Sequence, residues 1–185
     1  WAGVETALEQ DGSEATVTGG SPCRVIVFDL SSGGQRQHVY VTGKAPGVLP
    51  GASFNSLVDF ASLGDGRLLA MERRLDAFAG YGVTLRLITP DRGETDVSSI
   101  QSLRDAAFTP LRVETVADFG SLNPLGPGNV EGMAIGPAID DERGGRLLIL
   151  VSDDNFGREG ERGSLVIALR LVTSSDGGRA PSAPR

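Results

Sequence analysis

The chain has 185 residues, of which 39% are hydrophobic and 22% charged, and 24 acidic against 17 basic residues give a formal net charge of −7. This is the composition of one ordinary globular domain. Nucleic-acid phosphates are bound by grouped cations, so an acidic chain without a Lys/Arg cluster is not expected to have a nucleic-acid partner. The longest aliphatic run, 147–151, is too short to cross a bilayer, so no membrane span is expected.

One cysteine, Cys23, and one histidine, His38, limit the chemistry that the chain can carry. Neither an intrachain disulfide nor a zinc site built from several Cys and His ligands can form. A nucleophile paired with a histidine would have to use His38, which we interpret as a surface or packing residue on a strand. We interpret Cys23 as a small buried residue. The sequence identifies no catalytic residue.

Short runs rich in β-branched and aromatic residues alternate along the chain with clusters of Gly, Pro, Asp and Ser, a pattern typical of strands and turns. The predicted strands are 24–30, 37–43, 56–63, 67–72, 83–89, 112–119, 129–136, 146–152 and 164–171. The run 100–108 is the best candidate for a helix. The polar segment 173–185 is typical of a mobile tail. We therefore expect an all-β fold.

Two segments share one plan, 56–74 (SLVDFASLGDGRLLAMERR) and 129–154 (NVEGMAIGPAIDDERGGRLLILVSDD). Each has a strand with an acid near its start, a turn with glycine, and a second strand that ends in charged residues. The match aligns Asp59 with Glu131. The opening run, 1–12, resembles the second strand of an earlier unit. A sheet of up to about four strands repeated radially indicates a β-propeller.

The strands amount to about three blades, whereas a closed propeller usually has about four to eight. We therefore expect residues 1–172 to form half of a larger propeller, with 173–185 as its tail. The partner that completes it would be the missing half, on the same precursor or on another chain. Alone, the half would leave two blade faces exposed.

Several segments resemble the phytase-like domain of "esterase-like activity of phytase" proteins. NVEGMAIGP (129–137), LLILVSDDNF (147–156) and SLVIALRL (164–171) resemble its end, and VETALEQDG (4–12) and LGDGRLLAMERRLD (63–76) resemble two earlier parts. The resemblance implies that this chain is the C-terminal half of a propeller of about six blades. It also implies hydrolysis of phosphoric esters and an extracytoplasmic location, secreted, periplasmic or in an organelle lumen.

Carboxylates recur at related places of the repeat, on first strands that would line a channel and at the ends of second strands. Gathered at one rim, they would repel one another without a cation. Hard oxygen ligands favour Ca²⁺ or Mg²⁺, and Ca²⁺ is the cofactor that we expect. The candidate metal ligands are Glu5, Asp59, Glu72, Glu131, Asp153 and Asp154. A structural role in tying strands together and direct acid–base catalysis remain alternatives for these acids.

Arg73 and Arg74 directly follow one of these acids and are the candidate residues for binding a substrate phosphate. Salt bridges to neighbouring acids are the alternative. The function expected from the sequence is an exported, metal-dependent phosphoric-ester hydrolase with a phosphate-ester ligand. A non-catalytic propeller, acting as a binding module or a structural subunit of a larger assembly, is the alternative, so enzymatic activity is left open.

Overall fold

The computed structural model describes residues 1–47, 51, 53–91, 93–120, 128–157 and 164–172. Every regular element in these residues is a β-strand, which confirms the predicted all-β class. No helix that is long and apolar enough to cross a membrane occurs there. The tail expected over 173–185 lies outside the described residues.

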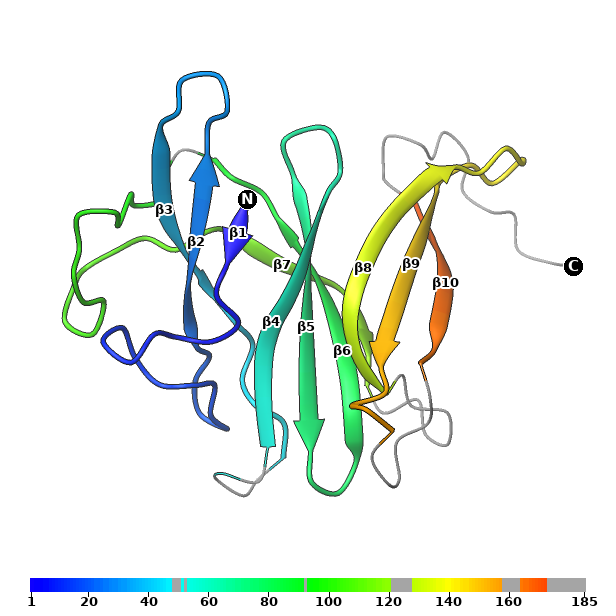
Figure 1. Cartoon of the computed structure of the whole chain (residues 1–185), viewed down its shortest axis with the longest axis horizontal. Helices are drawn as coiled ribbons and strands as arrows, with labels where there is room; N and C mark the ends of the chain where they lie inside the picture. Colours follow the sequence, from blue (N-terminus) through cyan, green and yellow to red (C-terminus); the bar gives the residue numbers. More distant parts are fainter. Residues whose placement is uncertain (48–50, 52, 92, 121–127, 158–163, 173–185) are drawn as a thin grey trace, which may run out of the picture.

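The described strands form three antiparallel sheets, which Figure 1 shows side by side. The first sheet has the order β1 (Ala2–Gly3), β2 (Pro22–Phe28), β3 (Gln35–Val41). The second has the order β4 (Ser53–Ser62), β5 (Leu68–Asp76), β6 (Gly80–Ile88), β7 (Val113–Phe119). The third has the order β8 (Asn129–Ala138), β9 (Arg146–Asp153), β10 (Val166–Leu171). The described residues form no closed ring, so the blade count of a propeller stays a prediction.

Each predicted strand overlaps an observed one, because the signals that define them are local. The turn between β4 and β5 contains Gly64 and Gly66 with φ of +87° and +90°, a backbone conformation that favours glycine. The opening run forms a strand only over Ala2–Gly3, and this strand pairs with β2, the next strand along the chain.

Residues 100–108, the best candidate for a helix in the sequence, form no helix, because tertiary partners take backbone groups of this segment. Arg24 on β2 donates to the carbonyl oxygen of Ile100 at 2.8 Å. Asp11 accepts a hydrogen bond from the N–H of Leu103 at 3.1 Å. These two backbone groups would otherwise pair within a helix. Their pairing with other parts of the chain favours an irregular segment instead.

Residues 95–111, the outer segment, cover part of the outer face of the first sheet. The N–H of Val97 donates to the carbonyl oxygen of Gln37 on β3 at 2.7 Å. Val97 and Leu103 pack against Val39, whose side chain is fully buried. The first sheet therefore lies between the second sheet and the outer segment. Two exposed blade faces are expected from the sequence, and the outer segment of the chain covers part of one of them.

Apolar cores fill the spaces on both sides of the second sheet. β5 supplies both, since its side chains alternate: Leu68 and Ala70 face the first sheet, while Leu69 and Met71 face the third. The core toward the first sheet includes Cys23, Val25, Tyr40, Leu57 and Ile88. The core toward the third includes Val83, Leu85, Val130, Leu148 and Leu150. β5, which has apolar side chains on both of its faces, is thus sandwiched between two layers.

A β-bulge interrupts the pairing of β4 with β5. Leu57 pairs with Glu72 and Asp59 pairs with Met71, which leaves Val58 as the extra residue. A bulge of this kind changes which side chains lie on each face of the strand. The position of Val58 is therefore the reference point for comparing β4 with its repeat in the third sheet.

β8 has a bulge at the corresponding place, where Glu131 is the extra residue between Val130 and Gly132. When the two bulges are superposed, Glu131 is equivalent to Val58, and Gly132 is equivalent to Asp59. The match of Asp59 with Glu131 made from the sequence is therefore off by one residue. Because neighbouring strand residues point to opposite faces, a shift of one places the two carboxylates in different surroundings.

Candidate functional site

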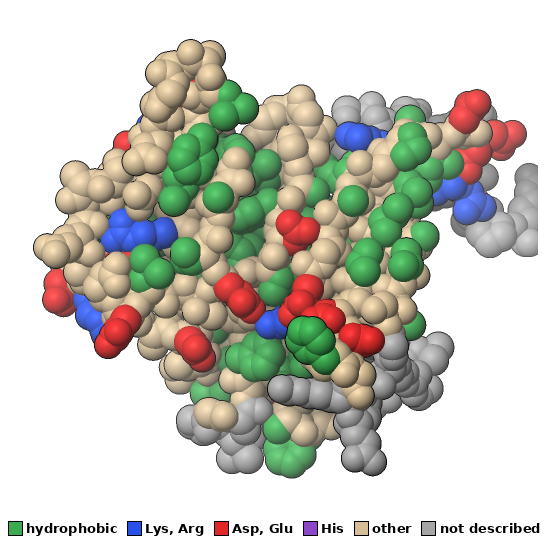
Figure 2. Space-filling view, in the orientation of Figure 1, with side chains coloured by type: hydrophobic (Ala, Val, Ile, Leu, Met, Phe, Trp, Pro, Cys, Tyr) green, Lys and Arg blue, Asp and Glu red, His purple; other side chains and the backbone are tan. Residues whose placement is uncertain are grey.

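Arg73 on β5 lies between an acid in the segment that follows β1 and an acid on β8. Its Nη2 donates to Oε1 of Glu5 at 2.8 Å, and its Nη1 donates to Oδ1 of Asn129 at 2.5 Å and to Glu131. Its guanidinium lies 5.3 Å from the centroid of the Phe54 ring, a cation–π contact. We name Arg73, Glu5, Asn129 and Glu131 the Arg73 cluster. Figure 2 shows acidic side chains gathered around a basic one at this end of the sheets.

The cluster combines a nearly buried cation with exposed acids. The side chain of Arg73 is 12% exposed, whereas those of Glu5 and Glu131 are 55% and 42% exposed. Two carboxylates against one guanidinium leave one negative charge uncompensated. Asn129 is buried, and its Nδ2 donates to Oε1 of Glu131 at 3.1 Å, which fixes that carboxylate. The arrangement presents excess negative charge to solvent over a nearly buried cation.

A depression of about 260 Å³ lies beside the cluster and is lined by Gly3, Glu5, Leu57, Val58 and Glu131. Oε1 of Glu5 and Oε1 of Glu131 bind Arg73, while Oε2 of each accepts no hydrogen bond from the described residues. Carboxylate oxygens of this kind suit a divalent cation that takes its other ligands from water and a bound phosphate. They do not make a cage of protein ligands alone.

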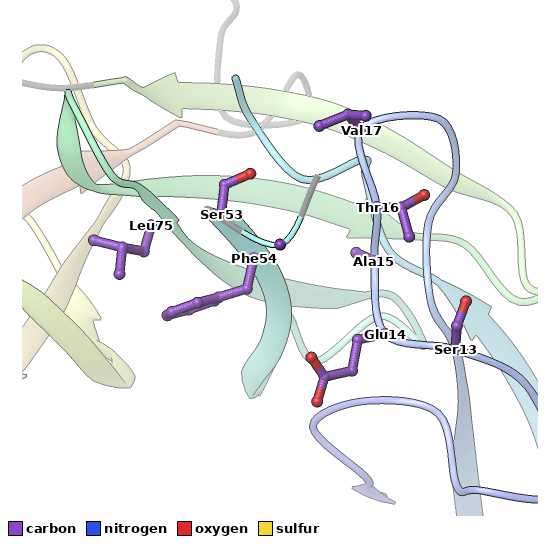
Figure 3. Close-up of a pocket in the computed structure, with 9 residues that line it drawn as sticks. Ser13, Glu14, Ala15, Thr16, Val17, Ser53, Phe54 and Leu75 are labelled. Carbon is purple, nitrogen blue, oxygen red and sulfur yellow. The ribbon is translucent and has the colours of Figure 1, made fainter. Parts of the chain in front are cut away.

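A larger groove, of about 540 Å³, is lined in part by Phe54, the aromatic residue that Arg73 contacts. Its lining is Ser13, Glu14, Ala15, Thr16, Val17, Gly51, Ser53, Phe54 and Leu75. Figure 3 shows Phe54 and Glu14 on opposite sides of this groove. Among the described residues of this lining, Glu14 is the only ionisable group. The groove therefore offers an aromatic surface and one carboxylate, but no pair of groups suited to acid–base chemistry.

Asp59 ties the second sheet to the third. Its Oδ2 accepts a hydrogen bond from the N–H of Met133 on β8 at 2.7 Å, and its Oδ1 accepts one from the N–H of Phe60 at 2.7 Å. Both carboxylate oxygens are thus bound to backbone groups. These contacts match the structural alternative considered for this acid.

Glu72 lies between the first and second sheets rather than at a rim. Its side chain is 1% exposed, and its carboxylate accepts hydrogen bonds from Tyr40, Asn55 and the N–H of Gly43. Arg86 pairs with it at 3.3 Å. Four donors around a buried carboxylate compensate its charge inside the protein. Glu72 is therefore separated from solvent and from the Arg73 cluster.

Asp153 and Asp154 lie where β9 ends and a turn begins. Each accepts a hydrogen bond at 3.1 Å, Asp153 from the N–H of Asn155 and Asp154 from the N–H of Phe156. Of the six acids predicted to gather, the structure brings Glu5 and Glu131 together on Arg73. Among the described residues, no three or more His, Cys, Asp or Glu side chains are grouped so as to hold a metal ion.

The two arginines predicted to bind phosphate lie on opposite faces of β5. Arg74 donates to Oγ1 of Thr84 at 2.6 Å and pairs with Asp118 on β7. Like Arg73, it is held in a salt bridge, as the alternative interpretation expected. Arg73 is distinguished from Arg74 by its position next to the depression between the sheets.

His38 and Cys23 take no part in the cluster. His38 is 8% exposed, and its Nδ1 lies 3.1 Å from the carbonyl oxygen of Thr95. Cys23 is a free, fully buried cysteine, as predicted, and burial raises the pKa of its thiol to about 12. A thiol with so high a pKa is not a reactive nucleophile at neutral pH.

The family model described as "Phytase-like: Esterase-like activity of phytase" matches residues 1–156, a range that contains the whole Arg73 cluster. The chain belongs to the phytase-like family. No match was found among the curated proteins or among the solved structures. The phytase-like assignment confirms the resemblance seen in the sequence. It also agrees with the fold, because the three packed antiparallel sheets are an arrangement typical of propeller blades.

Sequence reasoning missed a buried ion pair in this phytase-like chain, between Asp11 and Arg24. Arg24 donates to both carboxylate oxygens, at 2.6 and 2.8 Å, and the Asp11 side chain is fully buried. Hydrogen bonding from Arg24 lowers the pKa of Asp11 below its usual value. No local pattern signals this pair, because it is a bidentate contact between a loop and a strand. It holds the outer segment rather than a ligand.

Proposed function

We propose that this phytase-like protein is an exported, metal-dependent phosphoric-ester hydrolase whose phosphate site is the Arg73 cluster. The observation that supports the proposal most is the position of Arg73, 12% exposed between the exposed acids Glu5 and Glu131. A guanidinium can bind two phosphate oxygens at once. It would exchange a carboxylate for the phosphate of the ester.

In this proposal the released carboxylate takes a second role. Glu5 and Glu131 are the exposed ionisable groups that line the depression beside Arg73. A carboxylate freed from the guanidinium could accept a proton from an attacking water, which is general-base catalysis. Arg73 would meanwhile hold the phosphate against the depression.

Dependence on Ca²⁺ is the second part of the proposal. Its support is chemical: the two carboxylates carry one more negative charge than Arg73 compensates, and the Oε2 of each, which accepts no hydrogen bond from the described residues, is a hard oxygen ligand. A divalent cation held there would compensate the charge of a phosphoryl oxygen. Export is proposed from the resemblance of the chain to its family.

The second candidate is a non-catalytic propeller that binds a partner or serves as a structural subunit. It is favoured by a specific observation, namely that Arg73 already bonds to Asn129 on β8 and to Glu5 in the segment that follows β1. Under this alternative the role of Arg73 is structural, because its bonds connect separate parts of the fold. Under this alternative Glu5 and Glu131 are its fixed partners.

Phosphate release separates the two candidates. The protein at its natural length would be assayed with p-nitrophenyl phosphate and inositol hexakisphosphate, with Ca²⁺ and with EGTA. A hydrolase should show saturable release that EGTA abolishes, and Arg73→Lys should lower kcat/KM by about tenfold or more, since one charged contact is worth at least about 1.4 kcal/mol.

The matched control is Arg67→Lys, at a half-buried arginine that pairs with Asp65 outside the cluster. Its kcat/KM should stay at the wild-type value. If wild-type protein releases no phosphate from either ester in the presence of Ca²⁺, the non-catalytic candidate is the correct one.

A further inference from the structure

The turn that follows β9 holds two residues in an unfavourable backbone conformation. Asn155 and Phe156 have φ of +49° and +63°, and in the described part of the chain they are the only residues besides glycines with positive φ. The N–H of Gly157 donates to the carbonyl oxygen of Asp154 at 3.0 Å and closes the turn around them. Asparagine tolerates this conformation, whereas a residue as bulky as phenylalanine adopts it at a cost in free energy. The protein therefore stores strain at Phe156.

Phe156 is also unfavourably placed for an aromatic residue, because its side chain is fully exposed to solvent. An aromatic ring contributes to stability mainly when it is removed from water. Phe156 belongs to none of the three apolar cores that the described residues form. Neither the strain nor the exposure is therefore offset by packing against the described residues. A strained and exposed aromatic side chain of this kind indicates a role in binding.

Side-chain hydrogen bonds attach this turn to the Arg73 cluster. Oδ1 of Asn155 accepts a hydrogen bond from Nδ2 of Asn129 at 3.1 Å. Oδ1 of Asn129 in turn accepts one from Nη1 of Arg73 at 2.5 Å. Figure 1 shows that β5 and β9 end on the same side of the sheets. Asn155 thus fixes the position of the turn relative to the guanidinium, and Phe156 is the next residue along the chain.

We propose that Phe156 is a substrate-binding residue of the Arg73 cluster, and that the substrate is a monophosphate ester of an aromatic alcohol. This inference rests on the proposed function and names its substrate class. The phosphate binds Arg73, and the aromatic ring of the alcohol stacks against the ring of Phe156. Stacking removes both rings from water, and this gain offsets the strain in the turn.

The apolar surface beside Arg73 supports an aromatic alcohol. Gly3, Leu57 and Val58 line the depression next to the guanidinium and offer no polar side chain to a ligand. The ring of Phe54 lies 5.3 Å from the guanidinium and adds a further aromatic surface. A flat apolar ring fits such a lining better than a polyol does, because the hydroxyls of a polyol would lose their hydrogen bonds to water without gaining new ones.

The charge of the cluster supports a substrate with a single phosphate. Glu5 and Glu131 carry one more negative charge than Arg73 compensates, and both are exposed. One phosphate can be held by the guanidinium. Each additional phosphate on the same substrate would be repelled by the two carboxylates. The cluster therefore favours a monophosphate over an ester that carries several phosphates.

Binding of two phosphonates tests the inference without turnover, in the protein at its natural length with Ca²⁺ present. Phenylphosphonate and methylphosphonate carry the same anionic group, but only phenylphosphonate has an aromatic ring. Titration calorimetry should show that the wild type binds phenylphosphonate at least about tenfold more tightly than methylphosphonate. Phe156→Gly should reduce this preference to about twofold or less, because the stacking partner is lost.

Phe78→Gly is the matched control. Phe78 lies in the turn between β5 and β6, its side chain is 83% exposed, and it does not line the depression. The same substitution there should leave the preference for phenylphosphonate at the wild-type value.

Thermal denaturation without phosphonate gives a second readout. Glycine adopts positive φ without strain, so Phe156→Gly should raise Tm by about 2 °C or more. Phe78 does not have positive φ, so Phe78→Gly should not raise Tm. A lower Tm for Phe156→Gly would show that Phe156 packs against another part of the protein, and this result overturns the inference.

The outcomes distinguish this inference from the proposed activity. A preference for phenylphosphonate that Phe156→Gly removes supports the binding role of Phe156, even if the protein hydrolyses neither p-nitrophenyl phosphate nor inositol hexakisphosphate. In that case only the proposed hydrolysis is contradicted. Equal affinities for the two phosphonates, an unchanged preference in Phe156→Gly, or no binding of either phosphonate overturns the inference, even if phosphate esters are hydrolysed.

Discussion

The hydroxyl of Tyr40 donates a hydrogen bond to Oε1 of Glu72 at 2.5 Å and so joins the first sheet to the second. Glu72 is 1% exposed, and Tyr40 is fully buried. Burial, followed by the neighbouring carboxylate, raises the pKa of Tyr40. The hydroxyl therefore stays protonated and remains a donor throughout the pH range of ordinary experiments.

Tyr40→Phe should lower the free energy of unfolding by about 1.5–3 kcal/mol, the usual contribution of a hydrogen bond to a charged group. Urea denaturation measures this change. Tyr81→Phe is the control, because the Tyr81 hydroxyl makes no hydrogen bond with the described residues and its ring is only half-buried. Equal effects of the two substitutions would contradict a stabilising role for the Tyr40–Glu72 contact.

Asp59→Ala should lower the free energy of unfolding by about 1–3 kcal/mol, because it leaves the N–H of Met133 without its acceptor. Asp59→Asn keeps one carbonyl oxygen and should cost less. Glu114→Ala, at an exposed position of β7, should change stability by no more than about 1 kcal/mol. Stability measured with Ca²⁺ and with EGTA should show the same loss for Asp59→Ala. A loss that appears only with Ca²⁺ would instead indicate a metal ligand.

Because of the Asp11–Arg24 pair, we expect the free energy of unfolding to depend on pH in the acidic range. Since the pKa of Asp11 is lowered in the folded protein from about 3.8, the unfolded chain binds the proton more readily. The stabilisation from the Asp11–Arg24 pair is fully present above the pKa of Asp11 in the unfolded chain. It is lost as the pH falls through the lower pKa that Asp11 has in the folded protein. Asp11→Asn removes the titration, so its stability should fall less than that of the wild type between about pH 4 and about pH 2.

At neutral pH the same substitution should cost about 3 kcal/mol, because Arg24 loses the charge of its buried partner. Asp105→Asn is the control for acid sensitivity, since Asp105 is exposed. Its stability should follow the wild-type curve against pH. If Asp11→Asn also follows that curve, the carboxylate does not titrate below its usual pKa.

The proposed Ca²⁺ site predicts a stabilisation that depends on Glu131. At about 100 times its dissociation constant, Ca²⁺ should add about 2.7 kcal/mol to the free energy of unfolding, and EGTA should remove it. Glu131→Gln keeps one oxygen for Arg73 but lacks the charge, so it should abolish most of the difference. Thermal denaturation gives the measurement. Identical Tm values of the wild type with EGTA and with excess Ca²⁺ would show that Glu131 is a structural acid.

The sequence by itself determined the strands, because alternating β-branched residues and glycine turns act locally. Gly64 and Gly66, for example, mark the β4–β5 turn in the sequence and adopt positive φ in the structure. It also indicated the family, since the segments that carry the resemblance lie within the matched range, except for 164–171. Local signals of this kind need no knowledge of how distant parts of the chain meet.

Only the tertiary structure decided which charged groups meet. Asp59 and Glu131 occupy similar places in the repeated sequence. The bulged residue is Val58 in β4 but Glu131 in β8, so the two acids are one residue apart in the register of their strands. One acid then binds a backbone N–H and the other binds Arg73. The outer segment is irregular for a similar reason, since Arg24 and Asp11 bind its backbone. The register of a sheet and the pairing of buried charges depend on contacts between residues far apart in sequence, which no local pattern contains.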